Sequence, residues 1–237
     1  MSTPILEATG LTKRFGGVLA VDAVDFRVLP NEVVGIIGPN GSGKTTLFNL
    51  LSGFLRPASG TIRWEGRDVT KAAPHNRARA GLVRTFQESM VFPGLTVREN
   101  LAMAIRAAEL AGRQGQAADD LAEYVRITHV LDSIAQDLSW GQTRLLGIAL
   151  ALAMNPSVLL LDEPFAGLSP VAAEDVSAII RRLRVDGFSL CVIDHEMSFL
   201  LPICDRLVVL VNGATLADGD PQEIIDRHEV RAAYLGL

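Results

Sequence analysis

A glycine-rich segment that ends in lysine and threonine is the most chemically informative part of this sequence. Gly38–Thr45 reads GPNGSGKT and fits the pattern G-x-x-x-x-G-K-[ST]. It follows the apolar run Val33–Ile37, which predicts a buried strand, and the residues from Lys44 onward predict a helix. Glycines let the backbone wrap closely around phosphate, and successive N–H groups then converge at the start of the helix. The residues expected to bind a nucleoside triphosphate are Gly38, Pro39, Asn40, Gly41, Ser42, Gly43, Lys44, Thr45 and Thr46.

Two side chains of this loop have specific expected roles. Lys44 is expected to reach the β- and γ-phosphates, and the hydroxyl of Thr45 is expected to bind Mg²⁺. The alternative is a glycine turn that merely joins a strand to a helix. The order of strand, turn and helix favours the phosphate site over this alternative.

An apolar run that ends in two carboxylates forms a second candidate site. Val158–Glu163 reads VLLLDE, and a buried parallel strand places its last residues at the ligand-binding edge of a sheet. Asp162 is then expected to hold Mg²⁺, directly or through water, and Glu163 to polarise the attacking water as general base. The alternative is a strand that ends in a solvated acidic turn, which the phosphate loop in the same chain makes the weaker interpretation.

Gln87 and His195 follow two further strand-like segments. Gln87 ends the segment Arg84–Gln87, where the composition changes to a helical one, and a glutamine there could contact the metal or the attacking water. His195 follows an apolar strand and is expected at the same sheet edge, near the γ-phosphate. The alternatives are a surface glutamine and a structural histidine.

The segment Leu138–Gln142 predicts a second anion-binding helix start. Ser139 is a candidate N-cap, and Gly141 and Gln142 lie in the first turn of a helix predicted to extend to Met154. One γ-phosphate hardly needs two such helix starts from a single subunit.

The elements that must position these residues can be read from hydrophobic periodicity. The first thirty residues predict strands, and the strand and helix pattern over Ser157–Ile193 is typical of a parallel α/β sheet. A segment rich in Ala, Leu, Arg and Glu, from about Glu88 to Asn155, predicts a helical insertion. Its expected helices are Val97–Ala111, Ala117–Leu131 and Gly141–Met154, and a further helix is expected over Pro170–Arg184; strands are expected at Thr61–Trp64, Val158–Leu161, Ser189–Ile193, Arg206–Val211 and Ala214–Ala217.

Composition excludes several classes of protein. With 237 residues, 49% of them hydrophobic and 21% charged, the chain predicts a large globular α/β domain, and its net charge of −5 argues against general nucleic-acid affinity. The most apolar stretch, Leu145–Met154, is shorter than the roughly 20 residues that cross a bilayer. Cys191 and Cys204 lack metal-ligand or redox spacing, and Met1–Gly10 lacks the features of a signal peptide. We therefore expect a cytosolic chain in which Cys191 is buried.

Taken together, these motifs resemble those of the ATP-binding-cassette (ABC) transporter family over essentially the whole chain. They occur in the family order: Phe15, Gly38–Thr45, Gln87, Leu138–Gln142, Val158–Glu163, Ala166–Ser169 and His195. The resemblance implies an α/β fold with a P-loop NTPase (RecA-like) core, an N-terminal antiparallel β subdomain and an inserted α-helical subdomain. The whole chain, 1–237, would be one ABC ATPase domain, with 1–87 and 156–237 as the core and 88–155 as the helical subdomain.

The resemblance also implies how the site works. Phe15 would stack on adenine, and two subunits, identical or paralogous, would pair head to tail around ATP and Mg²⁺. Ser139, Gly141 and Gln142 would then serve the nucleotide of the other subunit. The partners implied are transmembrane permease subunits and, indirectly, a substrate-binding protein, at the cytoplasmic face of the cell membrane, with no nucleic acid.

Several stretches are similar to the ATPases of importers for branched-chain and other hydrophobic amino acids. They include Val83–Gln87, Ile193–Met197 and the tail Arg231–Gly236. The alternatives are the ATPase of a urea or short-amide importer, of a lipid or glycolipid exporter, a soluble ABC ATPase acting on nucleic acid, and a small-molecule P-loop kinase. The sequence departs from the commonest family pattern at Trp140, Leu150 and Ser169, where glycine, arginine and aspartate are usual.

Overall fold

Two β-sheets and a set of helices make up the fold of the computed structural model, which describes residues 3–86 and 90–235. The strands are β1 (Leu6–Phe15), β2 (Val18–Val28), β3 (Val33–Ile37), β4 (Ser59–Trp64), β5 (Arg67–Asp68), β6 (Leu82–Arg84), β7 (Val158–Asp162), β8 (Ser189–Ile193), β9 (Arg206–Val211) and β10 (Ala214–Gly219). The helices are α1 (Lys44–Leu51), α2 (Pro74–Ala80), α3 (Val97–Leu110), α4 (Ala118–Tyr124), α5 (Trp140–Leu152), α6 (Pro170–Val185), α7 (Met197–Leu200), α8 (Pro221–Ile225) and α9 (His228–Leu235). Single turns of 3₁₀ helix lie at Thr128–Val130, Ala135–Asp137 and Leu201–Ile203.

The larger sheet carries the predicted site. Its six strands run in the order β10-β9-β3-β8-β7-β6, and all neighbours are parallel except β10 and β9. Every residue of β3, β7 and β8 is buried. Strands that are covered on both faces read as continuous apolar runs, which is why these three were recognisable in the sequence.

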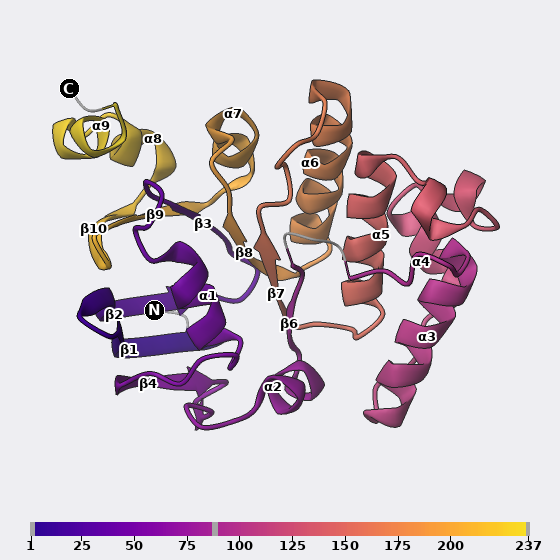
Figure 1. Cartoon of the computed structure of the whole chain (residues 1–237), viewed down its shortest axis with the longest axis horizontal. Helices are drawn as coiled ribbons and strands as arrows, with labels where there is room; N and C mark the ends of the chain where they lie inside the picture. Colours follow the sequence, from indigo (N-terminus) through magenta and orange to yellow (C-terminus); the bar gives the residue numbers. More distant parts are fainter. Residues whose placement is uncertain (1–2, 87–89, 236–237) are drawn as a thin grey trace.

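The two faces of this sheet are covered by different layers, as Figure 1 shows. On β3, Val34 and Ile36 pack into a core shared with α1 and the N-terminal sheet. Val33 and Ile37 point to the opposite face and join a core that includes α5 and α6. The alternation follows from the period of two along a strand, so one short strand connects both cores.

The N-terminal sheet is antiparallel, as the resemblance implied. Its strands lie in the order β2-β1-β4-β5, and α1 is packed between this sheet and the larger one. The P-loop fold with an antiparallel β part is therefore confirmed. The helix that follows the phosphate loop is buried on the residues Leu47, Phe48, Leu50 and Leu51.

The described part of the segment between β6 and β7 forms helices and 3₁₀ turns and no strand, apart from an isolated β-bridge between Thr96 and Ile134, as the composition predicted (Figure 1). α3 and α5 each begin with a capping box, Thr96 with Glu99 and Ser139 with Gln142. The exact domain boundaries proposed from the sequence stay a prediction. Among the described residues, no helix has both the length and the apolar character needed to cross a bilayer.

The helix predicted over Ala117–Leu131 is wrong in its second half. α4 ends at Tyr124, and Arg126 has a left-handed backbone with φ +63°. The N–H of Ile127 donates to the carbonyl of Ala122 at 2.8 Å, which is the backbone pattern of a helix end. Val125 and Ile127 are both fully buried, and Arg126 between them is exposed. Residues two apart on a helix do not share a face, so the helix has to end for both side chains to be buried.

Candidate nucleotide site

Three adjacent strands of the larger sheet bring the predicted residues together. β8 lies between β3 and β7, and Ile193 pairs with Ile36 on one side and with Asp162 on the other. The N–H of Glu163 donates to the carbonyl of Ile193 at 2.8 Å. The phosphate loop, the acidic pair and His195 therefore follow the carboxyl ends of neighbouring parallel strands, which is where such sheets bind ligands.

At two positions of the phosphate loop, a residue other than glycine would collide with neighbouring backbone atoms. Gly43 has φ +103°, and a Cβ there would collide with the carbonyl oxygen of Ala20. A Cβ on Gly38 would collide with the carbonyl oxygen of Leu210 and with the Ser42 hydroxyl. The loop borders a cavity of about 190 Å³ that is lined by Ala20, Asn40, Gly41, Ser42, Gly43, Lys44, Thr45, Thr46 and Glu163.

Lys44 lies inside this loop. Its Nζ donates to the carbonyl oxygens of Gly38 at 2.6 Å and Pro39 at 3.0 Å. Burial lowers the pKa of Lys44, while the carboxylates of Glu163 and Asp162 act in the opposite direction. Both acidic side chains are therefore within electrostatic reach of the loop, as the sequence predicted from two separate segments.

Glu163 lines the same cavity as the phosphate loop and has a constrained backbone. Its φ is +47°, a left-handed conformation that a residue with a Cβ rarely adopts. Outside turns and helix ends, such conformations cluster at functional sites, where the surrounding structure enforces them. Here the hydrogen bond to β8 holds the peptide of Glu163 in place.

Asp162 is held by an ion pair that the sequence did not predict. Its Oδ2 accepts from Nη2 of Arg84 at 2.7 Å, and both side chains are almost completely buried. Arg84 belongs to Val83–Gln87, a segment recognised in the sequence in which only Gln87 was assigned a role. Gln87 itself lies outside the described residues.

A second carboxylate, Asp194, organises the loop after β8. It is fully buried and accepts from the backbone N–H groups of Phe165, His195 and Glu196 at 2.8–2.9 Å. Burial raises the pKa of Asp194, and these three hydrogen bonds oppose that effect. Asp194 directly follows the apolar strand β8, and Asp162 is the last residue of the apolar strand β7, so the same sequence signal could have identified Asp194.

His195 reaches the predicted sheet edge with an exposed side chain. Its described contacts are to carboxylates, with Nδ1 3.8 Å from Asp194 and Nε2 3.5 Å from Glu196. The position after β8 agrees with the prediction, and contact with a γ-phosphate stays a prediction. Phe15 is the last residue of β1, and about half of its side-chain surface is exposed, with Nζ of Lys13 5.5 Å from the ring centre.

The helix start at Ser139 is separate from the phosphate loop. Ser139 caps α5 by accepting from the N–H of Gln142 at 3.3 Å, while Gln142 Oε1 accepts from the N–H of Ser139 at 2.9 Å. A different cavity, of about 300 Å³, is lined by Ser139, Gly141 and Gln142 together with residues of α6 such as Ala172. The predicted N-cap is confirmed, and within one chain it does not line the cavity at the phosphate loop.

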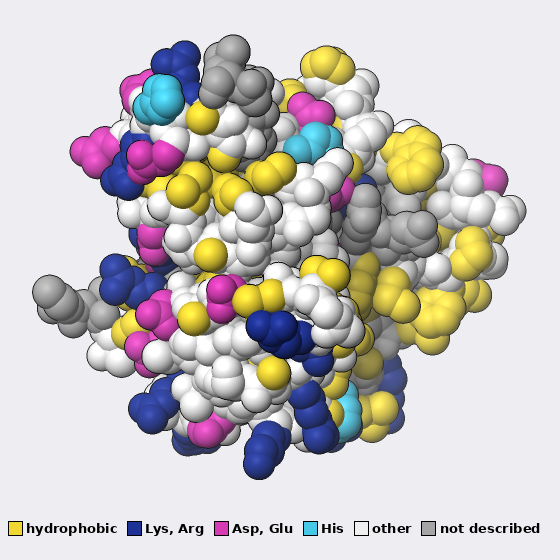
Figure 2. Space-filling model, turned by 60° about the vertical axis from the view of Figure 1, so that its left-hand side comes forward, with side chains coloured by type: hydrophobic (Ala, Val, Ile, Leu, Met, Phe, Trp, Pro, Cys, Tyr) yellow, Lys and Arg dark blue, Asp and Glu magenta, His cyan; other side chains and the backbone are white. Residues whose placement is uncertain are grey.

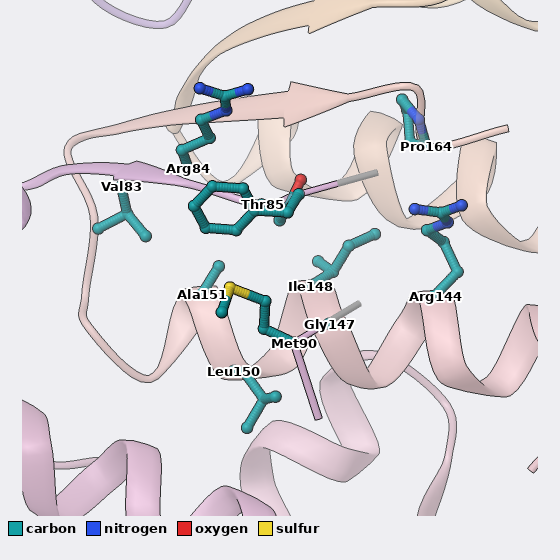
Figure 3. A pocket seen from close by; sticks show the side chains of 11 residues that line it. Val83, Arg84, Thr85, Met90, Arg144, Gly147, Ile148, Leu150, Ala151 and Pro164 are labelled. Carbon is teal, nitrogen blue, oxygen red and sulfur yellow. The ribbon is translucent and has the colours of Figure 1, made fainter. Parts of the chain in front are cut away.

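The three departures from the commonest pattern have clear structural settings. Trp140 opens α5 with 75% of its surface exposed. Ser169 caps α6 by accepting from the N–H of Ala172 at 3.3 Å. Leu150 lines a third cavity, of about 180 Å³, together with other residues of α5 and with residues of β6 (Figure 3).

Relatives match the sequence of this chain over nearly its whole length. A family model described as "ABC transporter" matches residues 21–166. The branched-chain amino acid transport ATP-binding protein BraF of Pseudomonas aeruginosa is 42% identical over 100% of this chain and 99% of its own. The lipopolysaccharide export ATP-binding protein LptB of Haemophilus influenzae is 38% identical over 98% of this chain and 97% of its own.

Solved structures agree with these relatives. The ADP conformation of MJ1267, an ATP-binding cassette of an ABC transporter, superposes with a TM-score of 0.89 at 31% identity and covers 100% of both chains. The family model spans the phosphate loop, the helix capped by Ser139 and the acidic strand end together. The chain therefore belongs to the ATP-binding subunits of ABC transporters, which hydrolyse ATP to power transport.

Proposed function

We propose that this ATPase powers the import of branched-chain or other hydrophobic amino acids, and that its site uses the residues described above. The observation that carries the site proposal is the cavity shared by the phosphate loop and Glu163. In it, Lys44 would contact the β- and γ-phosphates, and Glu163 would accept a proton from the water that attacks the γ-phosphorus. His195 would orient the water or contact the γ-phosphate.

The side chains at this edge fit Mg²⁺. In phosphoryl-transfer sites Mg²⁺ is held by one or two carboxylates together with substrate phosphates, and the cation neutralises charge on the phosphates. Asp162 is a buried carboxylate whose Oδ2 already accepts from the guanidinium of Arg84. Asp162 and the hydroxyl of Thr45 would hold the ion, with Gln87 as a further ligand.

A second subunit would complete the site. The capped helix start at Ser139 lines a cavity that shares no described lining residue with the phosphate-loop cavity. Head-to-tail pairing of two chains would bring Ser139, Gly141 and Gln142 to the nucleotide of the other, twice per dimer. Phe15 would stack on adenine at the outer side of each site.

The permease is proposed to dock on an apolar groove beside this site. The cavity that contains Leu150 is lined mainly by apolar side chains from α5 and β6 and by Met90 (Figure 3). Several large hydrophobic side chains are exposed on the molecule, among them Phe54, Met90, Phe92 and Met103. Figure 2 shows hydrophobic side chains gathered on the right-hand part of one face, where few charged side chains interrupt them. Docking there would place the chain at the cytoplasmic face of the membrane.

The substrate class rests on the relatives rather than on the site. The name of BraF, 42% identical over the full length, refers to branched-chain amino acid transport. Lipid export is the second candidate, because LptB is nearly as similar, at 38% identity. A urea or short-amide importer is a further alternative. ATP hydrolysis and coupling are the same in each case, so the transported molecule must be tested with the complete transporter.

The decisive experiment uses the chain with its own membrane partners in proteoliposomes. Uptake of labelled leucine that requires ATP, and that is lost in a Lys44→Ala variant, is the expected result. Parallel assays measure urea uptake and extraction of a labelled lipid. ATP-dependent transport of urea or lipid without leucine uptake would overturn the substrate proposal and leave the ATPase assignment intact.

A further inference from the structure

Arg84 joins three elements of the nucleotide site through one guanidinium group. At the end of β6, its Nη2 donates to Asp162 on β7 at 2.7 Å. Its Nη1 donates to Asn49 Oδ1 at 2.6 Å and to Ser52 Oγ at 3.2 Å, and these two residues belong to and immediately follow α1. The side chain therefore links the acidic strand directly to the helix that starts at the phosphate loop.

This link is buried and enclosed by aromatic rings. The side chains of Arg84 and Asp162 are 5% and 7% exposed. The guanidinium carbon lies 5.6 Å from the ring centre of Phe48, 5.9 Å from Phe54 and 5.2 Å from Phe86. Burying two charges is costly unless they stay paired in good geometry. The ion pair with Arg84 therefore restricts the position of the Asp162 carboxylate.

Asn49 relates the Arg84 contacts to the proposed metal ligand Thr45, because both residues lie on α1. Thr45 and Asn49 are four residues apart on α1, so they lie on the same face of the helix. By bonding to both Asn49 and Asp162, the guanidinium sets the carboxylate against the helix face that carries the Thr45 hydroxyl. A carboxylate has about four acceptor positions, so one oxygen bound to Arg84 leaves acceptor capacity for a metal or its water.

We propose that Arg84 is a positioning residue for the metal-holding Asp162, and that it connects this aspartate to the permease groove. The proposal rests on the proposed metal role of Asp162 and Thr45. Carboxylate ligands of metals are themselves commonly oriented by hydrogen-bonded partners, whose loss typically costs 10–100-fold in metal affinity. Among the described residues, Arg84 is such a partner of Asp162.

The connection to the groove follows from the surroundings of Arg84. Arg84 and Phe86 line the cavity that contains Leu150, and together with Phe54 they also line a second cavity, of about 400 Å³, beside α2. In Figure 3 the guanidinium of Arg84 extends from β6 across β7, away from α5. A protein segment that packs against the rings of Phe54 and Phe86 would therefore contact the residues that surround Arg84, the side chain that orients Asp162.

The test measures metal binding without hydrolysis. The Glu163→Gln chain is titrated with Mn²⁺ at saturating ATP, and bound and free Mn²⁺ are separated by electron paramagnetic resonance. Adding Arg84→Gln is expected to weaken Mn²⁺ affinity by about 10–100-fold, and Arg84→Lys and Asn49→Ala by smaller factors. Arg106→Gln is the matched control, because Arg106 is exposed and pairs with Glu109 on α3, and this substitution should leave the affinity unchanged.

Several outcomes would overturn the proposal. Unchanged or tighter Mn²⁺ binding in folded Arg84→Gln means that Arg84 does not position the ligand. If Arg84→Gln fails to fold, judged by thermal unfolding, Arg84→Lys and Asn49→Ala decide the question in the same way. Asp162→Asn tests the underlying proposal that Asp162 holds the metal. If Asp162→Asn also binds Mn²⁺ with normal affinity, that metal role is wrong.

A matched pair of phenylalanine substitutions tests the proposed connection between the groove and Asp162. Phe54 packs edge to face on Phe86, which lines the groove. Phe54 and Phe92 are both 52% exposed, and of these two rings Phe54 is the one that lies against the guanidinium of Arg84. Phe54→Ala is expected to weaken Mn²⁺ affinity measurably, and Phe92→Ala is expected to leave it unchanged. Equal affinities in the two variants would overturn the connection between the groove and Asp162.

Discussion

Glu163 is the residue on which hydrolysis is expected to depend most. It borders the phosphate-loop cavity, and its left-handed backbone is held by β8. Glu163→Gln keeps the shape and removes the base, so we expect ATP to bind normally while phosphate release falls by about 10²–10⁴-fold. A phosphate-release assay and nucleotide binding by calorimetry measure the two effects.

Glu109→Gln provides the control for this substitution. Glu109 is an exposed residue of α3 that pairs with Arg106, far along the chain from the strand ends of the sheet. Its substitution should leave both binding and turnover unchanged. Hydrolysis at the normal rate by Glu163→Gln would show that another group activates the water.

The two cysteines provide a second prediction for single residues. Cys191 is fully buried on β8, and burial raises its pKa well above that of a free thiol; burial also raises the pKa of Cys204 to about 12. Because thiolate is the reactive form, neither should react with iodoacetamide at pH 8 in the native chain. Mass spectrometry should find no label before unfolding and both thiols labelled after it in guanidinium.

Fast labelling of the native chain would mean that the region of β8 and Cys204 opens far more readily than its packing implies. The partly buried Cys204 places its sulfur against Gly35 of β3, close to where a Cβ would project. Labelling thus measures local opening of the sheet that holds the site.

At the scale of elements, α3 and α5 have the same type of cap, so the effect of losing a cap on stability can be measured separately from its effect on ATP turnover. Thr96 caps α3 and Ser139 caps α5, each with a reciprocal capping box. Replacing either by alanine should cost about 1 kcal/mol in the free energy of unfolding, measured by urea denaturation. Only Ser139 is proposed to serve a nucleotide.

Ser139→Ala is therefore expected to lower ATP turnover by about 10²-fold, the usual effect of removing one donor to the transition state. Thr96→Ala should keep its turnover despite a similar loss of stability. Equal turnover in the two variants would show that Ser139 is a helix cap and nothing more.

At the scale of the whole molecule, the separation of the phosphate loop from the helix start at Ser139, which is proposed to serve a nucleotide as well, predicts an ATP-dependent dimer. The Glu163→Gln chain with ATP and Mg²⁺ should have twice the monomer mass by light scattering. Adding Lys44→Ala should return it to the monomer, because the nucleotide would no longer bind. A monomer under both conditions would contradict head-to-tail pairing of two identical chains.

Trp140 offers an optical measure of the same event. The chain has two tryptophans, and Trp64 is 4% exposed whereas Trp140 is 75% exposed. Pairing across the helix start should cover Trp140 and shift its fluorescence to shorter wavelength on addition of ATP. Trp140→Phe should abolish the shift, and a shift that persists in this variant would place the change at Trp64 instead.

Several elements of the fold were readable because the chemistry of each is local. Val33–Ile37, Ser189–Ile193 and Arg206–Val211 were predicted with the bounds that the structure has, since strands covered on both faces are continuous apolar runs. α2 was missed although Pro74 opens it and Gly81 follows it, because seven residues carry too little periodicity. α4 was predicted too long because its end depends on burying Ile127, which the helical pattern alone does not reveal.

The sequence by itself determined the family, the phosphate loop, the acidic strand end and the cap at Ser139, because each depends on residue types at short fixed spacing. Only the tertiary structure decided that Asp162 pairs with Arg84, 78 positions away, and that Ser139 lies in a cavity apart from Lys44. Such contacts depend on the order of strands in the sheet, which periodicity does not encode. The order β3-β8-β7-β6 places β6 beside β7, so the guanidinium of Arg84 reaches the acidic strand end.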